Sequence, residues 1–84
     1  MTIVTGSRIK VVKGSTYHKL KKGSTGTVEE VKPMGAEYSH MVRLCINFEG
    51  RRLILWARFE SRLKETQVRL HGGDPTRNIV IALA

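Results

Sequence analysis

The sequence predicts a small all-β protein, and three observations lead to this prediction. Apolar and polar residues alternate with a period of two through most of the chain, as in half-buried strands. Short segments containing glycine separate these runs, as turns between strands do. The length of 84 residues suits one domain with a thin core. We therefore expect a small barrel of five strands, a short 3-10 turn and an added C-terminal strand.

The first two strands are expected at Arg8–Val11 and Gly26–Val31. The first alternates strictly and points its apolar side chains inward. In the second, Val28 and Val31 break the alternation, so we expect a bulge or a bend between them. A polar loop bounded by glycines, residues 14–23, joins the two strands.

The clearest pattern is a hairpin in which Met41–Phe48 and Arg51–Arg58 flank the turn Glu49-Gly50. A two-residue turn matches inward residues with inward residues, which supports this register. The inward pairs are Phe48–Arg51, Ile46–Leu53, Leu44–Leu55 and Val42–Ala57, and the outward pairs are Asn47–Arg52, Cys45–Ile54, Arg43–Trp56 and Met41–Arg58.

The carboxyl-terminal third contains a short 3-10 or α turn at Phe59–Leu63 and a strand at Gln67–Leu70. Turns are expected at Pro33–Gly35 and Gly72–Pro75. The last strand, Ile79–Leu83, is apolar on both faces and must be buried. Two alternatives remain open for it: pairing within the chain, or pairing with the same strand of a second copy to form a homodimer.

This order of elements is SH3-like, with the barrel at residues 6–71 and an added turn and strand at 72–84 of a single domain, 1–84. The amino-terminal part resembles a KOW motif, which belongs to ribosomal proteins and transcription elongation factors. The matching pattern is Gly6-x-x-Ile9-x-Val11-x-x-Gly14 followed by Gly23-x-x-Gly26-x-Val28, with a longer loop than the motif usually has. This resemblance implies RNA binding.

A second resemblance covers more of the chain. The segment Gly6–Val11, a Ser-Thr-Tyr loop, Gly26-Thr27-Val28 and a Phe-x-x-x-Leu turn are similar to the small stromal subunit of photosystem I. That family shares its fold with the variable chain of ferredoxin–thioredoxin reductase. Its members are basic docking modules, so this resemblance implies an acidic protein partner.

The charge is strongly basic and uneven. Fifteen Lys and Arg against seven Asp and Glu give a net charge of +8. Residues 1–28 hold six of these cations and no acid, which gives +6 in that segment. Such a field attracts nucleic acid or an acidic protein surface, although it also suits a merely solvated surface. The single cysteine, and the lack of a signal-peptide or membrane-spanning pattern, predict a cytoplasmic protein without membrane association.

No catalytic or cofactor pattern is visible, so we predict a protein that is not an enzyme and has no cofactor. His18, His40 and His71 lie far apart in the sequence, and a metal site needs three or four converging ligands. Cys45 and His40 fall on opposite faces of one strand, which excludes a nucleophilic pair. The adjacent carboxylates at 29–30 are expected to diverge, so paired-carboxylate chemistry is not expected.

Two surfaces are candidate binding sites. In the 14–23 loop, Tyr17 and His18 offer stacking rings among lysines, unless Tyr17 and Leu20 only pin the loop to the barrel. On the outward face of the hairpin, Arg43 can stack on Trp56, unless the last strand covers Ile54 and Trp56. The candidate residues are Arg8, Lys10, Lys13, Tyr17, His18, Lys19, Lys21, Lys22, Arg43, Arg52, Trp56 and Arg58.

These surfaces predict a non-catalytic binding module for RNA or single-stranded DNA. The alternative is a docking or accessory subunit that binds an acidic protein.

Overall fold

The computed structural model describes residues 2–34, 40–72 and 77–84. Within these ranges the fold is all-β, as the sequence predicts. The elements are β1 (Arg8–Lys13), β2 (Thr25–Pro33), β3 (Val42–Phe48), β4 (Arg51–Ala57), the 3-10 helix η2 (Glu60–Lys64), β5 (Gln67–Leu70) and β6 (Ile79–Leu83).

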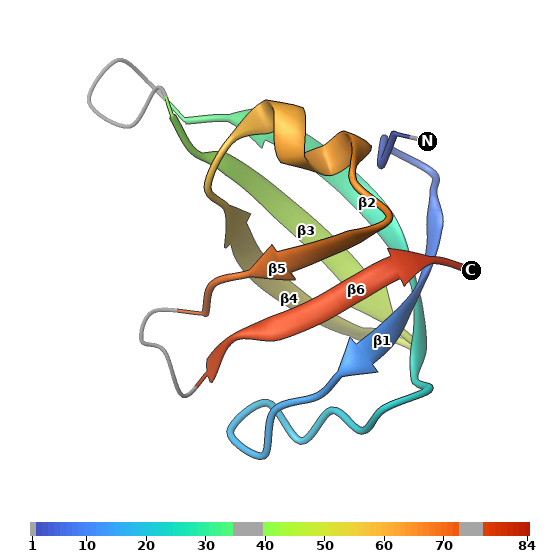
Figure 1. Ribbon diagram of the computed structural model, residues 1–84. Coiled ribbons are helices and arrows are strands. Elements are labelled where there is room, and N and C mark those ends of the chain that lie inside the picture. Colours follow the sequence, from blue (N-terminus) through green and yellow to red (C-terminus); the bar gives the residue numbers. More distant parts are fainter. Residues whose placement is uncertain (1, 35–39, 73–76) are drawn as a thin grey trace.

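The six strands form one antiparallel sheet in the order β4-β3-β2-β1-β6-β5. The sheet curls so that β5 and β6 lie in front of β3 and β4 in Figure 1. An isolated bridge joins the two ends of the sheet: the Trp56 N–H donates to the His71 carbonyl at 3.1 Å, and the His71 N–H donates to the Trp56 carbonyl at 2.7 Å. The curled sheet thereby encloses its apolar face.

The β3–β4 hairpin has the register that alternation predicts, from Val42 opposite Ala57 to Phe48 opposite Arg51. Its turn consists of Glu49 and Gly50, whose φ angles are 55° and 90°. Two positive φ angles match the right-handed twist of the flanking strands, and Gly50 adopts one without strain. The Gly50 N–H also donates to Oδ1 of Asn47 at 2.6 Å, which closes the turn.

The predicted irregularity in the second strand is a bulge. Val28 lies opposite Ile46 whereas Glu30 lies opposite Cys45, so Glu29 is the extra residue. The side chains of Glu29 and Glu30 are both exposed and both reach arginines of the hairpin. The expectation that these neighbouring carboxylates diverge is therefore wrong, because the bulge interrupts the alternation between them.

The last strand is internal to the sheet. The segment predicted as an addition, residues 72–84, contributes β6, which pairs with β1 on one side and β5 on the other. Ile79 and Ile81, which share one face of the strand, are fully buried. Val80 and Leu83 are half-buried, so the expected burial of the strand is confirmed only in part. Pairing within the chain thus occupies both edges of Ile79–Leu83, the segment proposed for edge pairing in a homodimer, and leaves neither edge free.

The core fills the concave side of the sheet with aliphatic side chains from every strand. The amino-terminal segment adds to it: Ile3 is buried, and its N–H donates to the Leu63 carbonyl of η2 at 2.8 Å. Within the described ranges, no helix has the length and apolarity needed to cross a membrane. Of the predicted turns, Gly35 and residues 73–75 lie outside the described residues.

Candidate functional site

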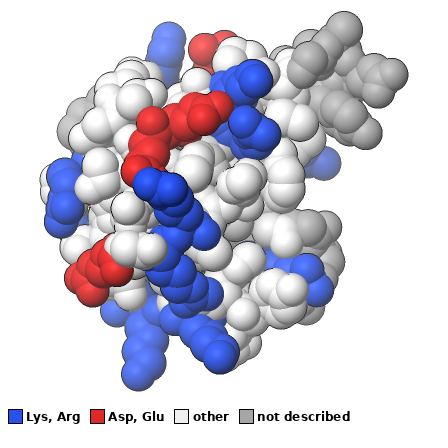
Figure 2. All heavy atoms as spheres, turned by 180° about the vertical axis from the view of Figure 1, so that it is seen from behind, with Lys and Arg blue, Asp and Glu red and all other residues white. Residues whose placement is uncertain are grey.

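Most of the predicted site residues fall into two separate regions, whereas Arg8 and Lys10 lie on β1 and Arg58 follows β4. We call the connection between β1 and β2 the loop face, with Lys13, Tyr17, His18, Lys19, Lys21 and Lys22. We call the outward side of β3 and β4 the hairpin face, with Arg43, Arg52, Ile54 and Trp56. The basic side chains gather toward the lower end of the molecule in Figure 2, the end at which the β1–β2 connection lies in Figure 1.

The loop is a tight turn rather than an open excursion. Ser15 and Leu20 exchange two backbone hydrogen bonds, each of 3.0 Å. Leu20 is buried in the core, whereas the Tyr17 side chain is 57% exposed. Leu20 therefore anchors the loop to the core, as one alternative predicted. Tyr17 does not, because its side chain remains accessible to solvent.

Glycine makes this turn possible. A Cβ atom at Gly14 would overlap the backbone carbonyl of Leu20, which cannot withdraw without opening the turn. At the other end of the loop, Gly23 has a φ of 93°, a conformation that side chains other than glycine rarely adopt. The two glycines that bound the loop in the sequence are thus both required by its backbone geometry.

Two arginines that the sequence analysis did not assign to this site reach the loop from other elements. The Arg77 guanidinium carbon lies 3.6 Å from the centre of the Tyr17 ring, so the two planar groups form a cation–π pair. Arg51, at the start of β4, donates a hydrogen bond from Nη2 to the His18 carbonyl. Only the fold brings these residues to the loop, because they lie far from it in the sequence.

His18 supplies a ring rather than a charge. Its ring meets that of Tyr17 edge to face, with centroids 5.1 Å apart. Burial of the ring, together with the positive charges of Arg51 and Arg77, lowers its pKa below the usual 6.5. The ring packs against Gly72, and its buried Nε2 has no hydrogen-bond partner among the described residues. His18 is therefore neutral at pH 7.

The lysines of the loop face are exposed and have no acidic partner among the residues that the structure describes. Within the described ranges, the ion pairs are Arg43–Glu30, Arg52–Glu29 and Arg62–Glu65, and none involves a lysine. Lys10 on β1 and Lys22 line one hollow together with residues of β6 and the start of β5. Arg8 differs from them, because its Nη1 donates to the Thr27 hydroxyl at 3.2 Å.

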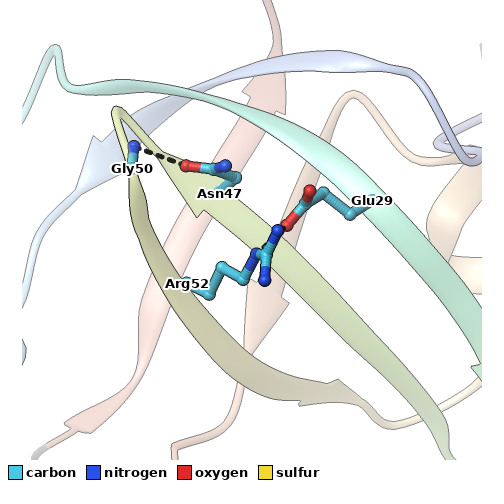
Figure 3. Close-up of polar contacts among 4 residues, drawn as sticks. All are labelled: Glu29, Asn47, Gly50 and Arg52. Carbon is cyan, nitrogen blue, oxygen red and sulfur yellow. Dashed lines mark hydrogen bonds and ion pairs between the residues drawn. The ribbon is translucent and has the colours of Figure 1, made fainter.

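The hairpin face is largely neutralised. Nε of Arg52 lies 2.8 Å from Oε1 of Glu29, and this contact crosses β3 (Figure 3). Nη2 of Arg43 lies 3.2 Å from Oε1 of Glu30. The predicted stacking of Arg43 on Trp56 is therefore not observed among the described contacts. The two residues are opposite one another, but the guanidinium turns toward the carboxylate.

The apolar part of the hairpin face is not covered by the last strand. Ile54 is 51% exposed, and Trp56 is half-buried. β6 lies between β1 and β5, on the other side of the sheet order from β4. Arg58 also separates from this face, because it lines a hollow with residues of η2 and β5.

The described residues contain no group of three or more His, Cys, Asp and Glu side chains that could hold a metal ion. Cys45 is a free, half-buried thiol on β3. What the site offers is positive charge and ring surface, which suit an anionic polymer. Protein-family models, curated proteins and solved structures yield no match to this chain.

Proposed function

We propose that this protein is a non-catalytic module that binds single-stranded nucleic acid, RNA or DNA, through its loop face. One observation carries the proposal: the connection between β1 and β2 holds an exposed Tyr17 and, within a few residues of it in the chain, exposed lysines that form none of the ion pairs among the described residues. Phosphates of a strand would lie against the lysines, and release of counterions would drive their association.

The ring surface gives the proposed site a means of holding a base. Arg77 covers one side of the Tyr17 ring, so a base would stack on its open side or on the outer plane of the guanidinium. A stacked base contributes about 1–3 kcal/mol and requires no particular sequence. An unpaired strand presents its base faces freely, which is why we favour single strands over a duplex.

The same proposal includes the fold family. We interpret the curled sheet as an SH3-like barrel in which β6 is an added strand between β1 and β5. The glycines of the KOW-like pattern support this interpretation, since Gly14 and Gly26 lie where backbones approach closely. The resemblance to KOW proteins agrees with a nucleic-acid ligand.

Fluorescence anisotropy of labelled single-stranded RNA, single-stranded DNA and duplex DNA tests the proposal at two salt concentrations. We expect micromolar or tighter binding of a single strand near physiological salt, with log affinity falling linearly with log salt. Absence of binding at low salt, despite the net charge of +8, would overturn it.

The exposed Ile54 favours a second candidate function, docking to another protein through the hairpin face. Its side chain is 51% exposed between Arg52 and Trp56 on the hairpin face, and such an apolar centre with a charged rim suits a protein surface. An Ile54→Ser variant would lose binding to such a protein but retain binding to a single strand. Loss of strand binding in this variant would instead place the nucleic acid on the hairpin face.

A further inference from the structure

A second cluster of cations lies apart from the loop face. Arg58 follows β4, Arg62 lies in η2 and Arg69 lies on β5, and all three line one hollow together with His71 and Glu65. In Figure 1, η2 lies at the top of the molecule and the β1–β2 connection at the bottom. The hollow shares no lining residue with the loop face, and the sequence gives no reason to expect it because its residues come from four segments.

The charges of this hollow are not balanced by its described residues. Three arginines and one glutamate give 3 − 1 = +2 among the charged residues that line it. Glu65 lies 3.9 Å from Nη1 of Arg62, a long contact between two exposed side chains, and this leaves Arg58 and Arg69 without an acidic partner in the described ranges. The Arg62 guanidinium also lies 5.7 Å from the centre of the Phe59 ring, which limits where it can point.

The pKa of His71 reflects the positive potential in this hollow. Its pKa is lowered by burial of the ring and then by the charges of Arg58, Arg69 and Arg62, while the approaching Asn78 side chain opposes the shift. Three guanidinium groups on different elements thus act on one imidazole. The His71 backbone is held by two hydrogen bonds to the Trp56 backbone, so its ring signals can report on the hollow.

We propose that this hollow binds a phosphate group through Arg58, Arg62 and Arg69. A guanidinium presents a planar fork of donors that matches the oxygens of a phosphate, and three such forks from different elements can surround a tetrahedral dianion. The phosphate is either the end of a nucleic-acid strand or a free phosphate or mononucleotide. This site is independent of the loop face and does not require that the proposed function hold.

NMR of the histidine side chains in the intact protein tests the proposal with inorganic phosphate as the probe. At pH 7 and constant ionic strength, added phosphate should shift the His71 ring signals along a saturating curve. His18 is the internal control, because its ring also lies near two arginines but in the other site. A linear shift shared by both histidines would show only a general response to anions and would overturn the site.

Matched variants sharpen the test. Arg69→Ala should weaken the saturable response by about tenfold or more, since it removes a charge-assisted contact. Lys32→Ala removes the same charge from an exposed position on β2 and should leave the response unchanged. An Arg69→Ala protein that responds like Lys32→Ala would contradict the proposal.

Two further probes identify the source of the phosphate. Tighter binding of an oligonucleotide with a 5′-phosphate than of its 5′-hydroxyl counterpart, lost in Arg69→Ala, indicates the end of a strand. Equal binding of the two oligonucleotides, with a saturable response to adenosine 5′-monophosphate, indicates a free phosphate ligand. In both cases strand binding at the loop face persists in Arg69→Ala, so failure of this site and failure of the proposed function are distinguishable.

Discussion

The loop face and the hairpin face both place basic side chains beside an aromatic ring, but they differ in where the carboxylates lie. On the hairpin face, Glu29 and Glu30 pair with Arg52 and Arg43. On the loop face, the nearby contacts of the cations are to a ring and a carbonyl: Arg77 covers Tyr17, and Arg51 binds the His18 carbonyl.

This difference shows that the number of cations on a surface does not measure its affinity for an anion. An exposed ion pair contributes only about 0–1 kcal/mol to stability, yet its carboxylate offsets the positive charge that the arginine would offer to a phosphate. We therefore locate the proposed binding activity in the loop face, where the charge is available, although both faces looked equivalent in the sequence.

The largest expected effect comes from breaking the turn that carries the loop face. In Gly14→Ala, the new Cβ would overlap the Leu20 carbonyl, so we expect the free energy of unfolding to fall by about 1–3 kcal/mol. Urea denaturation followed by circular dichroism measures it. Lys21→Ala, an exposed change in the same loop, should cost less than about 0.5 kcal/mol. Equal stability of the two variants would show that the turn is not rigid.

Removal of the ring tests whether the loop face supplies more than charge. We expect Tyr17→Leu to weaken binding of a single-stranded RNA by about 1–3 kcal/mol, because a base loses its stacking partner. Tyr17→Phe keeps the ring and should bind like the parent protein. Anisotropy titrations of the three proteins measure this effect. A leucine variant that binds as tightly as the phenylalanine variant would leave electrostatics alone as the source of affinity.

The difference in available positive charge between the two faces can be reduced by removing the carboxylate partner of one arginine on the hairpin face. Glu29→Gln removes the partner of Arg52, so strand affinity should rise a few-fold, while stability falls by no more than about 1 kcal/mol. Glu60→Gln changes the net charge equally and makes none of the described ion pairs, so it is the matched control. If both variants gain the same affinity, net charge rather than ion pairing separates the faces.

The smallest effect is a dependence of stability on pH. The pKa values of His18 and His71 are both lowered in the folded protein, so the unfolded chain binds more protons below the ordinary value of 6.5. The free energy of unfolding should therefore be highest above about pH 6.5 and fall as the solution is acidified through that value.

Denaturation curves between pH 5 and 8 measure this slope. His18→Gln and His71→Gln should each remove part of it, and the double variant should remove most of it. An unchanged slope in the double variant would assign the pH dependence to other groups.

The hairpin register could be predicted because its determinants are local, although the predicted pair Met41–Arg58 is not among the pairs that the structure describes. Alternation from Val42 to Phe48, a two-residue turn and matched inward faces leave one register, and the structure has it. The bulge was also predictable, since Val28 and Val31 cannot both point inward on a regular strand. These features depend on residues only a few positions apart.

The electrostatic character of each face could not be predicted, because it depends on contacts between distant segments. Arg52 and Glu29 are 23 residues apart, and Arg51 and His18 are 33 apart. The burial of β6 was evident from its apolar residues, but its place between β1 and β5 was not. The ion pairs of Arg43 and Arg52 depend on the sheet order, which places β2, β3 and β4 side by side.

The most direct test of the central claim is the binding of single-stranded RNA by Lys21→Glu/Lys22→Glu over a range of salt concentrations. Its control is Lys32→Glu/Lys64→Glu, which makes the same change in net charge at exposed positions of β2 and η2. We predict that the first variant binds at least about tenfold more weakly than the control and has a shallower salt slope, with both folded. Equal affinities and equal slopes in the two variants would contradict the claim that the loop face binds the strand.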